Sequence, residues 1–272
     1  ARYRAVLAAA ALALLCAWFW VVHGSDQYIL YDEYSHWGIF LKEMLASDGF
    51  WTGDTNSMHP RYPPGAWLWQ YLFNALTPPS ESKAYLGQFV LLLPPLLMLW
   101  EGVRWSQPAW IIAVFVLVLL GIANFGFGVS TLYVDQVIGV WYLGALLAAV
   151  ADDNLASWRL ALYAVPLAVI ALFKDVGLPL AVGAAVVLTA LVSQRILAAE
   201  RPRATVRKTA IALTALLAPT LLCVLTWSWN RDAVGAPHDV MSIDALVRGI
   251  ANETSGAGSA DNGPLLRQLY HD

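Results

Sequence analysis

Long apolar segments with almost no charge alternate with polar connections along the chain. A helix that crosses a bilayer needs about 20 residues, and about 17 is the lower limit. Five of the segments meet this length, and the third and fifth are slightly short. The pattern predicts an all-α integral membrane protein with about seven transmembrane helices, at Ala5–Val22, Ala84–Trp100, Pro108–Ala123, Val134–Val150, Trp158–Phe173, Val176–Val192 and Ala210–Trp229.

The fifth and sixth segments are separated only by Lys174 and Asp175. We therefore expect these two segments to be tilted, broken or partly re-entrant. The module of apolar segments spans residues 1–235. The polar, Gly-rich stretch 236–272 is predicted to be an extracytoplasmic tail or the beginning of an outer domain.

The distribution of Lys and Arg predicts the orientation, because cytoplasmic connections of membrane proteins are enriched in these residues. With a cytoplasmic N-terminus, the inner side carries nine basic residues, and five of them lie in the connection Gln194–Thr209. The nine are Arg2, Arg4, Arg104, Arg159, Arg195, Arg201, Arg203, Arg207 and Lys208. The first large loop, residues 23–83, then lies outside the cytoplasm.

This outer loop is predicted to contain two helices that lie along the membrane interface. The first runs from about Glu33 to Ala46, with Asp32 placed to cap it and Gly49 just past its end. The second, Ala66–Leu76, follows the chain break Tyr62-Pro63-Pro64-Gly65 and is rich in aromatic residues.

Composition narrows the functional classes. Of 272 residues, 59% are hydrophobic and only 13% are charged, which is about half the charge of a typical soluble domain. The formal net charge of −3 and the lack of a basic stripe argue against a nucleic-acid partner. Both cysteines, Cys16 and Cys223, lie in apolar segments, where they are expected to act as small buried hydrophobic residues.

Ionisable residues at the edge of the apolar segments are the candidates for chemistry, because a charge near hydrocarbon is costly. Asp32 and Glu33 follow the first segment: either one does chemistry while the other orients a neighbour, or Asp32 is simply a helix cap. Asp135 begins the fourth segment, where it is either functional or a boundary residue. Lys174 and Asp175 either neutralise each other, or Lys174 holds a lipid phosphate at headgroup depth.

Four short motifs stand at the outer ends of the apolar segments or in the first outer loop. They are Tyr31-Asp32-Glu33-Tyr34-Ser35-His36-Trp37, Tyr62-Pro63-Pro64-Gly65, Tyr133-Val134-Asp135 and Phe173-Lys174-Asp175-Val176-Gly177. Together these motifs resemble the GT-C superfamily of integral membrane glycosyltransferases, which take a sugar from a polyprenyl-phosphate carrier. The resemblance covers about residues 1–235, and that superfamily shares seven spans with a large first outer loop.

The resemblance implies roles for individual residues. Asp32 would act at the acceptor or at a metal, with Glu33 supporting it, and Asp135 would be the second acidic position of a divalent-cation site for Mg²⁺ or Mn²⁺. Lys174 and Arg61 would hold the carrier phosphate. Contacts with the sugar or the acceptor are expected from His36, Trp37, His59 and Tyr62.

The resemblance implies a glycosyltransferase of a bacterial inner membrane that acts at the extracytoplasmic face. Its partners would be a polyprenyl-phosphate-linked sugar, the lipid bilayer and other membrane subunits. The alternative is a non-catalytic membrane subunit or scaffold with the same fold. A transporter is less favoured, because its ionisable residues would lie near the middle of the bilayer.

Overall fold

The computed structural model describes residues 2–52, 54–101, 108–109, 112–113, 116, 128–151, 157–199 and 202–233. The chain divides into two units, Ala1–Ala236 and Pro237–Asp272. The second unit, and with it nearly all of the predicted tail 236–272, lies outside the described residues. So does most of the third predicted span, Pro108–Ala123.

Within the described residues the secondary structure is helical, and six of the seven predicted apolar segments form helices. In chain order the elements are α1 (Arg2–His23), the π-helical turn η1 (Glu33–Trp37), α2 (Gly38–Ser47), α3 (Gly65–Ala75), α4 (Glu81–Glu101), α6 (Asp135–Ala151), α7 (Ser157–Ala171), α8 (Gly177–Ala199) and α9 (Pro202–Ala233).

Two helical stretches of the described chain are long and apolar enough to cross a membrane. They are Gly177–Arg195, with 19 residues, and Val206–Ala233, with 28 residues. Shorter apolar stretches occur in α1, α6 and α7. The chain is thus mainly helical with two helices that could span a membrane, and the number of seven crossings stays a prediction.

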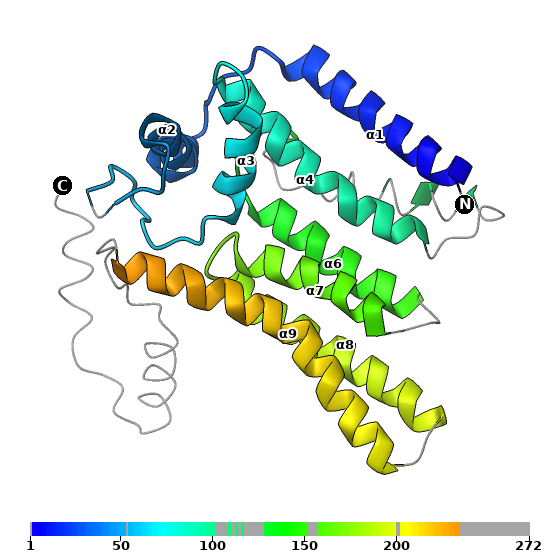
Figure 1. Ribbon diagram of the computed structural model, residues 1–272. Coiled ribbons are helices and arrows are strands. Elements are labelled where there is room, and N and C mark those ends of the chain that lie inside the picture. The colour runs from blue at the N-terminus through cyan, green and yellow to red at the C-terminus, as the bar shows by residue number, and fades with distance from the viewer. Residues whose placement is uncertain are drawn as a thin grey trace, which may run out of the picture. The chain divides into compact units, whose positions relative to one another are not determined.

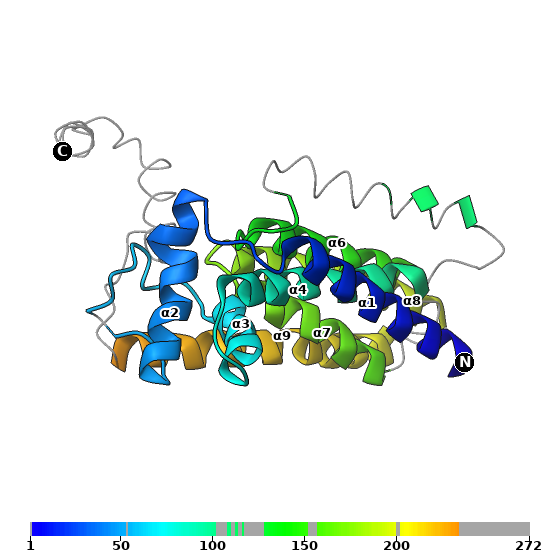
Figure 2. The same cartoon turned by 90° about the horizontal axis from the view of Figure 1, so that it is seen from above.

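The long helices lie side by side, and α2 and α3 lie at one end of them (Figures 1 and 2). α7 packs against both α8 and α9, while α4 packs against α1, α3 and α6. Where α2 and α3 lie, α1, α7 and α9 end and α4, α6 and α8 begin. We call this the loop end of the bundle.

The predicted helix from Glu33 to Ala46 consists of two elements, η1 and α2. The N–H of Gly38 donates to the carbonyl of Glu33, five residues earlier, which is the π-helical pattern. A Cβ at Gly38 would lie only 2.2 Å from the ring of Tyr28, so glycine lets that ring pack on the backbone. α2 ends at Ser47, and the following residue, Asp48, has a left-handed backbone with a φ of 51°. The end of the helix thus comes just before Gly49, as predicted.

Glu33 joins three parts of the loop end. Its side chain is fully buried. Oε2 accepts the backbone N–H groups of Ile29 and Leu30, both at 3.0 Å, and the hydroxyl of Tyr85 at 2.8 Å. Oε1 accepts the N–H of Leu132 at 3.1 Å. One carboxylate therefore ties the start of the loop to α4 and to the segment before α6.

Stacked aromatic rings form the core of the first loop. Trp37 and Trp67 are almost completely buried, with ring centroids 5.2 Å apart, and the indole N–H of Trp67 donates to the carbonyl of Trp37 at 2.7 Å. Trp51 packs between Phe40 and Trp227, the latter on α9. The tryptophans of the loop thus hold it as a folded cap against α3 and α9.

Replacing Glu33 by alanine should destabilise the fold by roughly 3 kcal/mol or more, because four donors, two of them buried, lose a charged acceptor. Glu33→Gln keeps one carbonyl oxygen and should lose less. Unfolding of the purified protein by urea in detergent micelles measures this. Asp54→Ala, an exposed carboxylate in the same loop, is the control. Equal stability of the Glu33→Ala and Asp54→Ala variants would contradict the anchoring role.

Candidate functional site

Two ion pairs at the loop end connect residues that are far apart in the sequence. Arg61 Nε lies 2.8 Å from Asp175 Oδ2. Lys174 Nζ lies 3.0 and 3.2 Å from the two carboxylate oxygens of Asp135. Lys174 and Asp175 therefore have separate partners, and they do not form the mutually neutralised pair that was one alternative from the sequence.

The Tyr62-Pro63-Pro64-Gly65 break places Arg61 beside the turn between α7 and α8. The N–H of Gly65 donates to the carbonyl of Leu172 at 2.8 Å, and a Cβ at Gly65 would lie 2.8 Å from the Leu172 Cβ. Only glycine permits this approach without a shift of the backbone. From the other side, the indole N–H of Trp227 donates to the Arg61 carbonyl at 3.0 Å.

A buried chain of amides positions the segment that leads into Asp135. Gln70 of α3 donates to the side-chain oxygen of Gln88 on α4 at 3.0 Å. Gln88 in turn donates to the carbonyl of Tyr133 at 3.0 Å. Because both glutamine side chains are almost fully buried, this chain orients the start of α6, where Asp135 pairs with Lys174.

Four aromatic side chains pack together beside the ion pairs. The rings of His59 and Tyr62 are stacked, with centroids 4.8 Å apart, and His36 meets His59 edge-on at the same distance. Trp37 stacks on Tyr62 at 5.6 Å. Trp37 is only 1% exposed, so it lies behind Tyr62 and supports the stack, and the sugar contact expected from it stays a prediction.

The two histidines favour the neutral form. Burial and then the positive charge of His59 lower the pKa of His36 to about 4, against opposing contributions from Asp32 and Asp135. Burial and the charge of Arg61 lower the pKa of His59. Since Lys174 contributes to both shifts, the imidazoles and the ion pairs form one electrostatic cluster.

Asp32 belongs to this cluster and is not a helix cap. Its backbone is helical, with φ −67° and ψ −23°, and its side chain makes no capping hydrogen bond. The negative charge of Asp32 acts on His36 and on His59. Burial, then the charge of Asp32 and a hydrogen bond to its side chain, raise the pKa of Tyr133. The cap prediction is thus wrong, and the partly exposed carboxylate is available for other contacts.

The side chains of Glu33 and Asp32 point in different directions and have different surroundings. Adjacent helical residues point about 100° apart, and here Glu33 points into the core while Asp32 faces the cluster. All four donors to Glu33 are protein groups. Glu33 therefore anchors the loop end, and the catalytic role expected for it stays a prediction.

The predicted cation site rests on Asp32 and Asp135 alone. Among the residues that the structure describes, no three His, Cys, Asp or Glu side chains are grouped to hold a metal ion. Mg²⁺ in proteins is often bound by one or two carboxylates together with water and substrate phosphates. Two carboxylates near His36 are compatible with that mode, and the Mg²⁺ or Mn²⁺ site stays a prediction.

The structure brings together most of the residues singled out in the sequence: Asp32, His36, His59, Arg61, Tyr62, Asp135 and Lys174. Tyr133 and Asp175 join them in the structure, although no sequence feature of their own singled them out as site residues. Each of them lies in the same short motif as a residue that was chosen, Asp135 or Lys174. This closeness in the sequence is the feature that could have pointed to them.

Comparisons with protein-family models, with curated proteins and with solved structures give no match. The functional argument therefore depends on the site itself. Its parts are a carboxylate without a capping role, two neutral imidazoles, and two cations paired with exchangeable carboxylates. Such a site can accept a proton and bind an anion at the same surface.

The stability of the protein should fall with decreasing pH through His36. The unfolded chain takes up this proton near pH 6.5, the folded chain only near pH 4. The contribution of the neutral His36 to the free energy of unfolding is therefore complete above pH 6.5. It is lost as the pH falls towards 4, at up to about 1.4 kcal/mol per pH unit. Denaturant unfolding of His36→Gln and the parent chain between about pH 7.5 and about pH 3.5 tests this, because these limits enclose both pKa values of His36. Parallel pH profiles would contradict it.

Proposed function

We propose that the chain is an integral membrane glycosyltransferase of the GT-C type. It moves a sugar from a polyprenyl-phosphate carrier to an acceptor hydroxyl at the extracytoplasmic face of a bacterial inner membrane. The observation that carries the proposal is the convergence of Asp32, Arg61, Asp135 and Lys174 on one cluster, where the apolar helices end. A phosphate whose lipid tail stays in the bilayer must bind at that depth.

Exposed apolar side chains support the membrane location. On α9, Leu222 and Leu225 are 64% and 65% exposed, and on α8, Val186 is 58% exposed. Contiguous apolar faces of this kind are rare on soluble monomers. α8 has 23 residues and is therefore about 35 Å long, close to the bilayer's hydrocarbon thickness of about 30 Å.

The orientation is supported by the position of the basic connection. Arg195 and Arg207 lie near the ends of α8 and α9 that are remote from the loop end. The cluster of Asp32, Arg61 and Lys174 is thus at the opposite end of these helices from the most basic connection. Under the positive-inside rule, the cluster lies outside the cytoplasm, which is compatible with the seven-span topology that we propose.

The proposed reaction is a single displacement. Asp32 takes the proton of the acceptor hydroxyl, whose oxygen forms a bond to the anomeric carbon, while the bond from that carbon to the phosphate oxygen breaks. Polyprenyl phosphate leaves with the electron pair, and Lys174 and Arg61 stabilise its charge. A divalent cation held by Asp32 and Asp135 would supply further positive charge at the phosphate.

The ion pairs are compatible with this use of the cations. The side chains of Lys174 and Asp135 are 27% and 45% exposed. Ion pairs of that exposure contribute only about 0–1 kcal/mol, so a doubly charged phosphate can replace Asp135 as the partner of Lys174. The alternative, a silent subunit of the same fold, is favoured by the fact that each cation already has a carboxylate partner.

Replacing Asp32 by asparagine should lower sugar transfer by at least about a hundredfold, the scale for loss of a general base. The melting temperature should change little, because the side chain keeps its size and makes no cap. The assay follows radiolabelled sugar moving from polyprenyl-phosphate donors to lipid acceptors in proteoliposomes. Asp54→Asn, the same change at an exposed position of the same loop, is the control.

Full activity of Asp32→Asn on a donor that the parent chain uses would exclude Asp32 as the base. Failure of the parent chain to bind or use any polyprenyl-phosphate-linked sugar would favour the silent subunit.

The topology predicts that residues 58 and 206 lie on opposite sides of the membrane. Met58 and Val206 are 59% and 72% exposed, so a cysteine at either position is accessible. In a chain without Cys16 and Cys223, an impermeant thiol reagent added to intact cells should label Met58→Cys and not Val206→Cys. Lysed cells, where both should react, are the control. Labelling of both positions in intact cells would contradict the model.

A further inference from the structure

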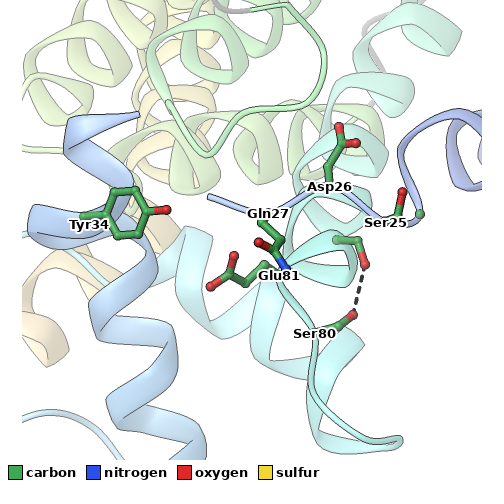
Figure 3. A pocket seen from close by; sticks show the side chains of 8 residues that line it. Ser25, Asp26, Gln27, Tyr34, Ser80 and Glu81 are labelled. Atoms are coloured by element: carbon green, nitrogen blue, oxygen red, sulfur yellow. Dashed lines mark hydrogen bonds between the residues drawn. The ribbon is translucent and has the colours of Figure 1, made fainter. Parts of the chain in front are cut away.

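A polar pocket lies at the loop end, and its lining residues differ from those of the charged cluster. It has a volume of about 490 Å³, within the range of about 300–1,000 Å³ that small-ligand sites occupy. Three segments contribute to it: the residues after α1, η1 and the beginning of α4 (Figure 3). Its lining is polar apart from one glycine: Gly24, Ser25, Asp26, Gln27, Tyr34, Ser80, Glu81 and Ser82.

The two carboxylates of this pocket already have partners within the protein. Asp26 accepts from His23 Nδ1 at 2.8 Å and from the Ser130 hydroxyl at 2.7 Å. Glu81 accepts from Lys42 Nζ at 2.5 Å and from the Tyr28 N–H at 2.7 Å. A cationic ligand would have to compete with Lys42 for Glu81 and with two hydrogen-bond donors for Asp26. An anionic ligand would meet two carboxylates, so the pocket favours a neutral polar ligand.

The uncommitted groups of the pocket both donate and accept hydrogen bonds. The side chains of Ser25 and Gln27 are exposed and make no hydrogen bond to other described residues. Ser80 and Ser82 share one hydrogen bond at 3.1 Å, drawn in Figure 3, and Ser80 Oγ also accepts the N–H of Lys83 at 3.3 Å. The Tyr34 hydroxyl donates to the Tyr28 carbonyl, and its oxygen can still accept. Sugar hydroxyls also donate and accept, so this mixture is complementary to a polyol.

The pocket and the charged cluster share η1. Tyr34 lines the pocket, while His36, two residues later, belongs to the cluster. From Gln27 to Asp32 the chain advances five residues, which spans at most about 18 Å. An oligosaccharide that is held in the pocket can therefore reach towards Asp32.

We propose that this pocket binds a neutral oligosaccharide, as the part of the acceptor that is remote from the reacting hydroxyl. The use of this pocket in sugar transfer rests on the proposed function, whereas the binding of an oligosaccharide to the pocket does not depend on it. Ser25→Trp fills the mouth of the pocket without removing a hydrogen bond, and Gln27→Ala removes a free amide.

Binding is measured in the Asp32→Asn variant, so that oligosaccharide binding is tested independently of sugar transfer. Purified protein in detergent is titrated with mannotriose and arabinotriose, and with spermidine as a cationic probe, by isothermal calorimetry. Saturable binding of a neutral trisaccharide that weakens at least tenfold in both pocket variants supports the site, with Asp54→Asn as the matched control. In the active chain, Ser25→Trp should raise KM for oligosaccharide acceptors and leave kcat and simple glycoside acceptors unchanged.

Three outcomes would overturn the assignment: no saturable binding of either trisaccharide, trisaccharide binding that Ser25→Trp and Gln27→Ala leave unchanged, or binding of spermidine in preference to both sugars. Each of these can occur in a chain that still transfers sugar. Conversely, trisaccharide binding can persist in a chain without transfer activity, so the two proposals fail separately.

Discussion

The buried carboxylate of Glu33 is the interaction on which the loop end depends. A charged group can be fully buried only when its oxygens are satisfied, and Glu33 meets this condition with three backbone N–H groups and one phenol. These donors come from the start of the loop, from α4 and from the segment before α6. The direction of Asp32, the neighbouring residue, is a consequence of how Glu33 is held.

The charged cluster is arranged as an exchangeable network around neutral rings. Arg61 and Lys174 each have a partly exposed carboxylate partner, so either pair can open at little cost. The histidines are kept neutral by burial and by the same cations. This combination lets the surface take up negative charge without exposing an unpaired cation in its resting state.

Tryptophan serves two purposes in this chain. Those of the first loop, Trp37, Trp51 and Trp67, are buried and build a rigid cap. Others, such as Trp18 and Trp229, are 49% and 78% exposed near the helix ends at this side of the bundle, as expected for rings at an interface. Trp227 lies only two residues before Trp229 on α9, yet it is 7% exposed and its indole N–H donates to the carbonyl of Arg61.

The sequence by itself determined the helices and the neighbourhood of the site. Apolar length and the break at Tyr62-Pro63-Pro64-Gly65 are local properties, so α3 starts within one residue of its predicted position. Ionisable residues at segment ends were visible for the same reason. The π-helical register of η1 could not be predicted from the sequence, because it depends on the packing of Tyr28 against Gly38.

Only the tertiary structure decided which charges meet. Asp175 pairs with Arg61, 114 residues earlier, and Lys174 pairs with Asp135, 39 residues earlier. The same holds for the acidic pair: sequence could not tell the anchor from the exposed carboxylate, since Asp32 and Glu33 are chemically alike. Their roles differ because the four donors that surround Glu33 come from segments up to 99 residues away, and only folding brings those donors together.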